Sequence, residues 1–233
     1  MKSKEEWKVY GNVFSEFSLQ TLFKMSGQGY FDDLKTPLAI GKEANVFTAI
    51  TKEKKIIVAK IYRLENCNFN KMYNYISADM RYSNIKRSKR EIVFAWTQRE
   101  YRNLMKAREV IKVPTPIAVR NNILLMEFIG KHDPAPMLKS QLPKNPKKFF
   151  AKTIQNIKKL YKAGLIHGDL SEYNILNYEE EPIFIDFSQC TTTESGNAKE
   201  LLDRDINNVC NFFKKYFDID EKKIKETLQK NQK

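Results

Sequence analysis

A stretch of polar side chains between Leu165 and Leu176 is flanked by apolar residues on both sides. Asp169 lies in the middle of this stretch, and Asn174 follows five positions later. A second acid, Asp186, ends the short apolar run that starts at Ile183. Carboxylates among core-forming residues are costly to bury unless something pairs with them. A divalent metal carrying a phosphate ester would provide that partner, so the pattern predicts an anion- and metal-binding site at the edge of a hydrophobic core.

The spacing between Asp169 and Asn174 indicates a particular class of reaction. Asp-x-x-x-x-Asn is the spacing of the protein-kinase catalytic loop. In phosphoryl transfer an Asp of that loop meets the attacking hydroxyl, while the Asn and a second Asp hold magnesium. The sequence therefore predicts a phosphotransferase.

Length, charge and cysteine content limit the number of domains, the kind of partner and the cellular compartment. The 233 residues predict one domain with room for two lobes, and the net charge of +13 favours an anionic partner or reflects a generally basic proteome. Cys67, Cys190 and Cys210 form no CxxC pair, which indicates neither a disulfide framework nor a zinc site and favours the cytoplasm. The sequence has no signal-peptide pattern and no run of about 18 apolar residues, so no membrane association is expected.

Periodicity predicts a mixture of strands and helices. A helical segment is expected over residues 1 to about 36, and a long loop over 63–90. Strands are expected over 38–40, 46–50, 56–62, 117–119 and 123–128, and further helices over 91–109, 147–163, from about 198, and in the tail 221–233. The cluster Asp203-Arg204-Asp205 in the helix near 198 is interpreted as a helix-surface or lobe-bracing charge cluster.

Two charged residues break apolar patterns. Lys60 lies within a predicted strand, where it is either a phosphate-binding lysine or a lysine at a sheet edge with its charge in solvent. Glu100 shares one helix face with Val93, Trp96 and Leu104, so it is either buried with a partner or solvated at the border of that face. A strand lysine paired with a helix glutamate positions ATP phosphates in kinases, so we predict a Lys60–Glu100 ion pair.

Two further segments have open interpretations. Residues 81–90 alternate basic residues with aromatics and serines, as expected of a loop that contacts RNA phosphates, of a loop with a phosphorylatable serine, or of an ordinary solvated surface. The strand ending at 128 leads into a connector, where the backbone atoms of Glu127 and Ile129 are candidates for contacts with an adenine edge.

Three motifs resemble the signatures of the RIO family of atypical serine/threonine protein kinases. They are Gly41-Lys42-Glu43-Ala44-Asn45-Val46-Phe47, His167-Gly168-Asp169-Leu170-Ser171-Glu172-Tyr173-Asn174 and Ile185-Asp186-Phe187-Ser188-Gln189. The resemblance covers roughly residues 15–216. About 35 residues precede the core, too few for the winged-helix domain of the second RIO subfamily, so the chain resembles the first subfamily and, in its compact length, an archaeal member.

The resemblance implies an α+β fold: a trimmed two-lobe protein-kinase-like fold, with a small β-rich N-lobe containing one long helix and a mostly helical C-lobe. The implied division is an N-terminal helical extension over 1–35, the N-lobe over 36–128 and the C-lobe over 129–233.

The resemblance also implies roles. Asp169 would be the catalytic base, Asn174 and Asp186 would hold Mg²⁺, for which Mn²⁺ can substitute, and Lys60 would bind ATP phosphate with support from Glu100. Gly41 and Lys42 would contact the phosphates, because Ala39 and Ile40 stand where the family usually has a hydroxyl residue. Asp186 would also be a transient phosphate acceptor.

The implied function is that of an ATP- and Mg²⁺-dependent serine/threonine kinase or ATPase in maturation of the small ribosomal subunit. Serine autophosphorylation is a family trait, and the pre-small subunit and its rRNA would be the partners. Two alternatives stay open: a nucleotide-binding rRNA scaffold with little catalysis, and a small-molecule kinase related to aminoglycoside or choline kinases.

Overall fold

The chain forms two compact units. The structure, a computed structural model, describes residues 14–65, 67–77, 82 and 85–229. The first unit comprises residues 1–102 and 115–128, and the second comprises 103–114 and 129–233. The end of the long helix and the segment after it, residues 103–114, thus group with the second unit.

The first unit is built on a five-stranded antiparallel sheet with the strand order β1-β2-β3-β5-β4. The strands are β1 (Asp33–Ile40), β2 (Ala44–Ile50), β3 (Ile56–Tyr62), β4 (Pro116–Arg120) and β5 (Ile123–Glu127). The predicted strands are all present. β1 is longer than predicted and begins inside the segment predicted to be a helical extension.

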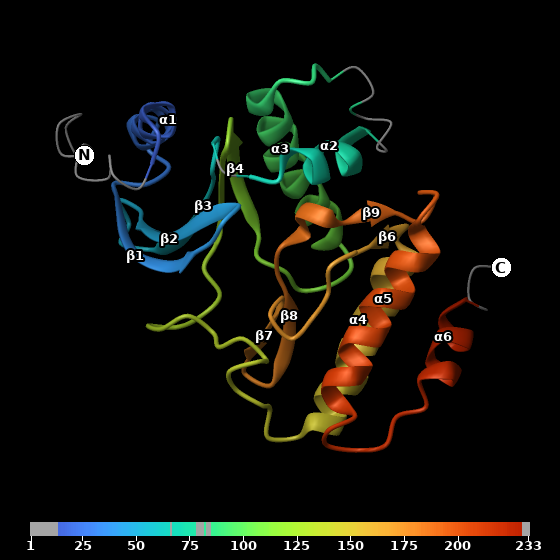
Figure 1. Cartoon of the computed structure of the whole chain (residues 1–233). Coiled ribbons are helices and arrows are strands. Elements are labelled where there is room, and N and C mark those ends of the chain that lie inside the picture. The colour runs from blue at the N-terminus through green and yellow to red at the C-terminus, as the bar shows by residue number, and fades with distance from the viewer. Residues whose placement is uncertain (1–13, 66, 78–81, 83–84, 230–233) are drawn as a thin grey trace. The chain divides into compact units, whose positions relative to one another are not determined.

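Strand β3 separates two packing environments, as alternation along a strand requires. Its residues Ile57, Ala59 and Ile61 join a buried cluster with Leu22 and Met25 of helix α1 (Glu16–Gly27). The alternate residues Lys60 and Tyr62 turn toward helix α3 (Lys89–Ala107), which Figure 1 shows in green beside the sheet. The buried lysine of β3 therefore faces a long helix.

The prediction of a loop over 63–90 is wrong in part. Residues Phe69–Ser77 form helix α2, whose Met72 and Ile76 are buried against α3 in one cluster with Trp96. A nine-residue helix is marginal alone, so this packing stabilises it. Arg81 and Ser83 of the basic segment lie outside the described residues.

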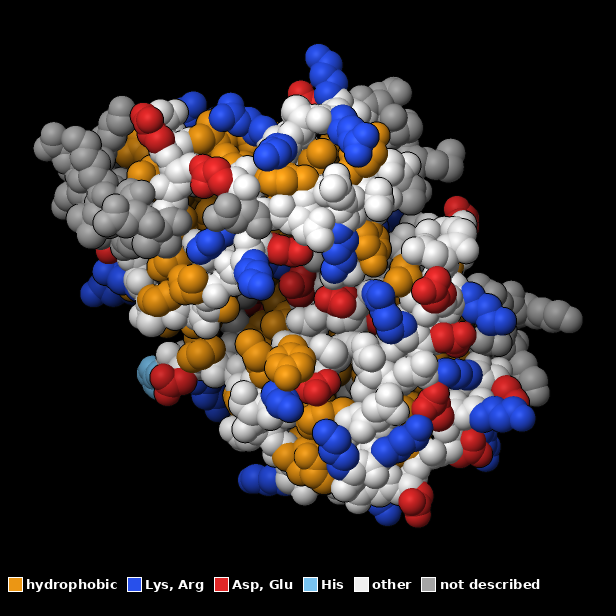
Figure 2. All heavy atoms as spheres, in the orientation of Figure 1, with side chains coloured by type: hydrophobic (Ala, Val, Ile, Leu, Met, Phe, Trp, Pro, Cys, Tyr) orange, Lys and Arg blue, Asp and Glu red, His pale blue; other side chains and the backbone are white. Residues whose placement is uncertain are grey.

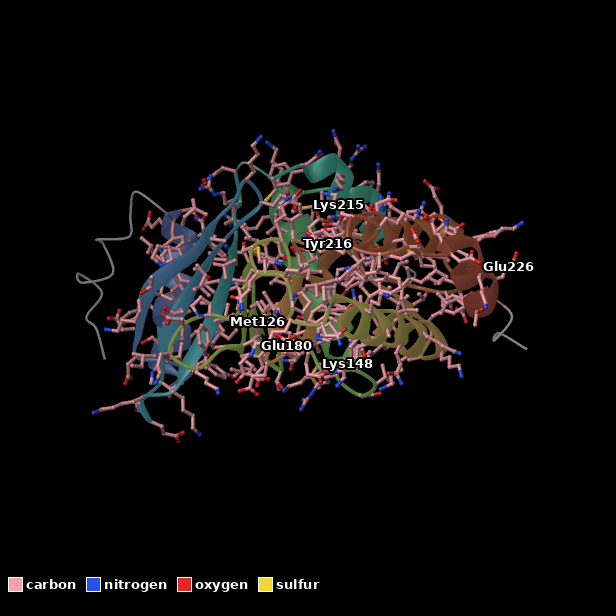
Figure 3. The ribbon with its side chains drawn as sticks, turned by 90° about the horizontal axis from the view of Figure 1, so that it is seen from below. Met126, Lys148, Glu180, Lys215, Tyr216 and Glu226 are labelled. Atoms are coloured by element: carbon pink, nitrogen blue, oxygen red, sulfur yellow. The ribbon has the colours of Figure 1, made fainter. Side chains whose placement is uncertain are left out.

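The second unit is mainly helical. Helices α4 (Pro146–Lys162) and α5 (Ala198–Phe213) lie side by side, and α6 (Glu221–Gln229) packs on α5 (Figure 1). Four short strands form two antiparallel pairs, β6 (Leu165–Ile166) with β9 (Thr191–Thr192) and β7 (Ile175–Tyr178) with β8 (Glu181–Phe184). The β7–β8 turn is tied to α4, because Lys152 bonds with the Glu181 carboxylate and the Glu180 backbone oxygen; Glu180 is labelled in Figure 3.

Two further features concern the cysteines and possible membrane spans. Cys67, Cys190 and Cys210 are all buried, and none of them forms a disulfide. Among the residues that the structure describes, no helix has the length and apolar composition needed to cross a membrane.

Candidate active site

The predicted Lys60–Glu100 pair is present and buried. The Lys60 ammonium lies 2.8 Å from Glu100 Oε1, and the two side chains are 8% and 0% exposed. The hydroxyl of Tyr62, two residues after Lys60 on the same strand face, donates to the other carboxylate oxygen of Glu100. Lys60 also lies 5.1 Å above the centre of the Tyr62 ring. Glu100 is thus held at both oxygens, and it fixes the position of the lysine.

Sequence reasoning missed Tyr62, although its position two residues after Lys60 placed it on the same face. We expect Tyr62→Phe to raise the KM for ATP roughly three- to tenfold with a smaller change in kcat. A hydrogen bond to a charged group contributes about 1.5–3 kcal/mol, and because Tyr62 acts on Lys60 only through Glu100, about half of that should reach the bound nucleotide. Steady-state kinetics at varied ATP would measure this split. An unchanged KM would show that the hydroxyl does not help to place Lys60.

The predicted phosphate-contact turn precedes β2. Gly41 N donates to Ala44 O at 3.0 Å, and a Cβ on Gly41 would lie only 3.0 Å from the same oxygen. The tight turn therefore favours glycine at this position. Lys42 is exposed, as are Ala39 and Ile40.

The predicted adenine contacts involve the end of β5 and the residue after Phe128. Glu127 is fixed by two bonds to Thr115, one from its own N–H to the Thr115 oxygen at 2.8 Å and one from Thr115 N to its carboxylate at 3.0 Å. The Ile129 carbonyl accepts from Ala135 N at 2.8 Å. Glu127 and Ile129 fall in different units, and their contact with a base stays a prediction.

In the second unit, Asp169 and Asn174 lie in the loop between β6 and β7. The Asn174 side-chain nitrogen donates to the Asp169 carbonyl at 2.8 Å, which closes the loop on itself. Gly168 precedes Asp169 with a φ of +79°, and a Cβ there would lie 2.9 Å from the Gln189 carbonyl oxygen. The loop therefore requires glycine at 168, both for its backbone conformation and for this close approach.

Asp186 follows the β7–β8 hairpin and is next to Asn174, since Ile185 N donates to the Asn174 carbonyl at 3.0 Å. Its backbone is left-handed, with φ 62° and ψ 68°, a conformation that is uncommon outside glycine and is concentrated at functional sites. Asp186 Oδ1 accepts from the Ser188 hydroxyl at 2.7 Å. The structure therefore groups Asp169, Asn174 and Asp186 in the second unit, and Lys60 with Glu100 in the first.

The residues present fit a magnesium ion. The Asn174 amide nitrogen is committed to Asp169, so its oxygen is the atom offered to a cation. Mg²⁺ is commonly held by one or two carboxylates together with substrate phosphates and water, which matches Asp186 and Asn174 with a bound nucleotide. Among the described residues no three His, Cys, Asp or Glu side chains cluster as a metal site.

An acid on α5 fixes the loop around Asp169. Asp205 is buried and accepts from Gly168 N at 2.7 Å and from Leu170 N at 2.8 Å, the two amides that flank Asp169. Arg204 donates to the Gly168 carbonyl. The Asp203–Asp205 cluster is therefore not only a surface feature, because its last member positions the loop that contains Asp169. Asp205 lies three residues after Leu202 and four before Val209, so it falls on the apolar face of α5. This position of an acid among apolar residues could have indicated its burial from the sequence.

Burial raises the pKa of Asp205 from 3.8 to about 7, although the Leu170 and Gly168 amides and Arg204 act in the opposite direction. Because the pKa is higher in the folded chain, folding takes up a proton between these two values. We expect the free energy of unfolding to fall as pH rises from 5 to about 7 and then to level off. Urea unfolding at a series of pH values would show this, and Asp205→Asn should remove that part of the pH dependence.

Comparisons with known proteins identify the family. A family model described as a RIO domain matches residues 45–226. A protein of Methanocaldococcus jannaschii named RIO-type serine/threonine-protein kinase Rio1 is 42% identical over 216 residues, covering 92% of this chain and 74% of the relative. The Rio1 of Haloferax volcanii is 37% identical, with 92% and 75% covered. Human serine/threonine-protein kinase RIO1 is 33% identical, and the match covers 93% of this chain but 39% of that protein.

A solved structure supports the fold. The Rio2 kinase of Chaetomium thermophilum, in a structure titled as an ADP/Mg²⁺-phosphoaspartate complex, superposes with a TM-score of 0.70 at 26% identity. The superposition covers 92% of this chain and 67% of that one. The predicted α+β protein-kinase-like fold is thereby confirmed.

Proposed function

We propose a function from the premise that this chain belongs to the RIO family and is a Rio1-type serine/threonine-protein kinase, as predicted. The proposal is that it uses ATP and Mg²⁺ and acts in maturation of the small ribosomal subunit, in contact with rRNA. The adjacency of Asp169, Asn174 and Asp186 supports the chemistry most directly.

In the proposed reaction the Asp169 carboxylate accepts the proton of a serine hydroxyl as that oxygen attacks the γ-phosphorus of ATP. The bond to the β,γ-bridging oxygen breaks, and ADP leaves. Bound Mg²⁺ would neutralise the phosphate charge. Lys60 would bind phosphate oxygens, and Glu100 and Tyr62 would keep its ammonium in place. Positioning and charge neutralisation supply most of the barrier lowering in such transfers.

A second route fits the same residues. The Asp186 carboxylate would itself attack the γ-phosphorus, and water would then hydrolyse the acyl phosphate, which gives net ATP hydrolysis. The Rio2 structure that is titled as a phosphoaspartate complex supports this route for a relative. An acid-stable, hydroxylamine-sensitive phosphate that appears on Asp186 during turnover would support it, and its absence under those conditions would exclude it.

The alternative of an rRNA scaffold with little catalysis makes a different prediction for turnover. The exposed Ala39 and Ile40, in place of hydroxyl residues near Gly41, are the observation in its favour. ATP hydrolysis and serine autophosphorylation should be measured with and without purified small-subunit particles. Turnover that the particles change supports the proposal, whereas particle binding without measurable turnover supports the scaffold. Cytoplasmic location stays a prediction from the cysteines.

A further inference from the structure

A basic surface in the first unit is separate from the residues assigned to ATP. It consists of five exposed cations on α2, in the segment before α3 and at the start of α3: Lys71, Lys86, Arg87, Lys89 and Arg90. We call these five residues the α2–α3 basic surface. In Figure 2, Lys and Arg side chains (blue) gather at the upper edge of the molecule, over the start of α3.

Three of these cations rest on aromatic rings. The Arg87 guanidinium lies 4.9 Å from the centre of the Tyr73 ring, Lys89 lies 5.1 Å from that of Phe69, and Arg90 lies 4.6 Å from that of Phe17. Within the described part of the chain, none of the three pairs with a carboxylate. A ring restrains a cation without neutralising it, so the positive charge stays available to an external anion.

A pocket opens beside two of these cations. Its volume is about 560 Å³, and its lining is Ser15, Glu16, Phe17, Gln20, Leu64, Glu65, Lys89 and Arg90. The Phe17 ring stacks on the Phe94 ring, with 5.5 Å between the ring centres, and the Arg90 guanidinium lies over the Phe17 ring. An aromatic ring and a guanidinium therefore lie together on one side of the pocket. The Glu16 and Glu65 carboxylates are exposed and can accept hydrogen bonds.

We propose that the α2–α3 basic surface binds single-stranded RNA, with phosphates on the cations and one base in the pocket. Unstacked bases are commonly held against aromatic rings or arginine planes and are recognised by hydrogen bonds to their edges. The two carboxylates favour a base over an acidic side chain as the group inside the pocket, because they would repel a carboxylate there but accept from base amino groups. The proposal rests on the proposed function only for the source of the RNA, which would be ribosomal.

The binding should be strongly salt-dependent. Each phosphate neutralised on a single strand contributes roughly 0.7 to the slope of log affinity against log salt, so removal of four cations should flatten that slope by about 3. A base held in the pocket adds a contribution that salt does not change. The cations and the pocket can therefore be distinguished experimentally, because loss of the cations should change the salt dependence and loss of the pocket contact should not.

The test uses the full chain and a fluorescent, mixed-sequence single-stranded RNA. A variant with Lys71, Arg87, Lys89 and Arg90 changed to Ala should bind at least about tenfold more weakly and show the flatter salt slope. The matched control changes four exposed α4 lysines to Ala and should keep the affinity within about twofold, although the net charge falls equally. These are Lys147, Lys148 (labelled in Figure 3), Lys159 and Lys162. Glu65→Ala should weaken binding without changing the slope.

Each outcome decides the proposal. Equal losses in the two four-residue variants would mean that net charge, not this surface, binds RNA, and would overturn it. Polyglutamate that competes as well as RNA would also overturn it, in favour of an acidic protein partner. ATP turnover without RNA and the melting temperature should match wild type in all variants. A wild-type chain with RNA binding but no turnover would reject the proposed function and leave this inference standing.

Discussion

Asp169→Asn should lower ATP turnover and serine phosphorylation about 10²- to 10⁴-fold, the range that a positioned general base contributes. Asparagine has nearly the same shape but cannot take the proton of the attacking hydroxyl. The structure indicates that the loop itself will survive, because Asn174 bonds to the backbone carbonyl of residue 169, which the substitution keeps. The loss should therefore fall on kcat, with the affinity for ATP nearly unchanged. Rapid-quench phosphorylation and nucleotide binding would measure the two separately.

The matched control is Glu172→Gln in the same loop. It removes one negative charge three residues away from Asp169 and keeps the backbone carbonyl that Lys139 N contacts at 3.0 Å. We expect its turnover to stay within about threefold of wild type, since it takes no part in the proposed proton transfer. Wild-type turnover in Asp169→Asn would reject Asp169 as the base. Equal losses in both variants would point to the charge of the loop and not to proton transfer.

The parts of the site that the sequence predicted are those in which a charge interrupts an apolar pattern. Lys60 and Glu100 are 40 residues apart in the chain, yet the strand and helix periods each placed one charge on a buried face, and two buried opposite charges need each other. Asn174 and Asp186 flank one short hairpin, so local pairing brings them together. The cost of burial thus made the Lys60–Glu100 pair predictable, and chain proximity did so for Asn174 and Asp186.

The parts that the sequence missed depend on tertiary packing. Residues of α2 lie between polar segments and were predicted as a loop, because only Met72 and Ile76 of this helix are fully buried, and they pack against α3. The Tyr62 hydroxyl has no signature of its own, since a strand tyrosine is ordinarily a packing residue. Its role depends on the position of Glu100, and that position is set by the fold.

Asp205→Ala should lower both stability and turnover, and it is the largest structural effect that we expect. Loss of the carboxylate leaves the N–H groups of Gly168 and Leu170 buried without their acceptor. Each unsatisfied buried group costs about 1–3 kcal/mol, offset in part because burial of the charge was itself unfavourable, so we expect a loss of about 3 kcal/mol. A backbone shift of about 1 Å at Asp169 would lower kcat about 10²-fold. Urea unfolding and steady-state kinetics would measure the two effects.

Comparison with Asn at the same position separates packing from hydrogen bonding. In Asp205→Asn the side-chain oxygen can accept from one of the two amides, while the side-chain nitrogen would face the other donor. We therefore expect a stability between wild type and Asp205→Ala, with turnover still reduced. Glu200→Ala, an exposed acid on the same helix, should cost less than about 1 kcal/mol and leave turnover unchanged. If Asp205→Ala keeps wild-type turnover, then Arg204 and Asn208, which donate to the Gly168 and Leu170 carbonyls, hold Asp169 in place without Asp205.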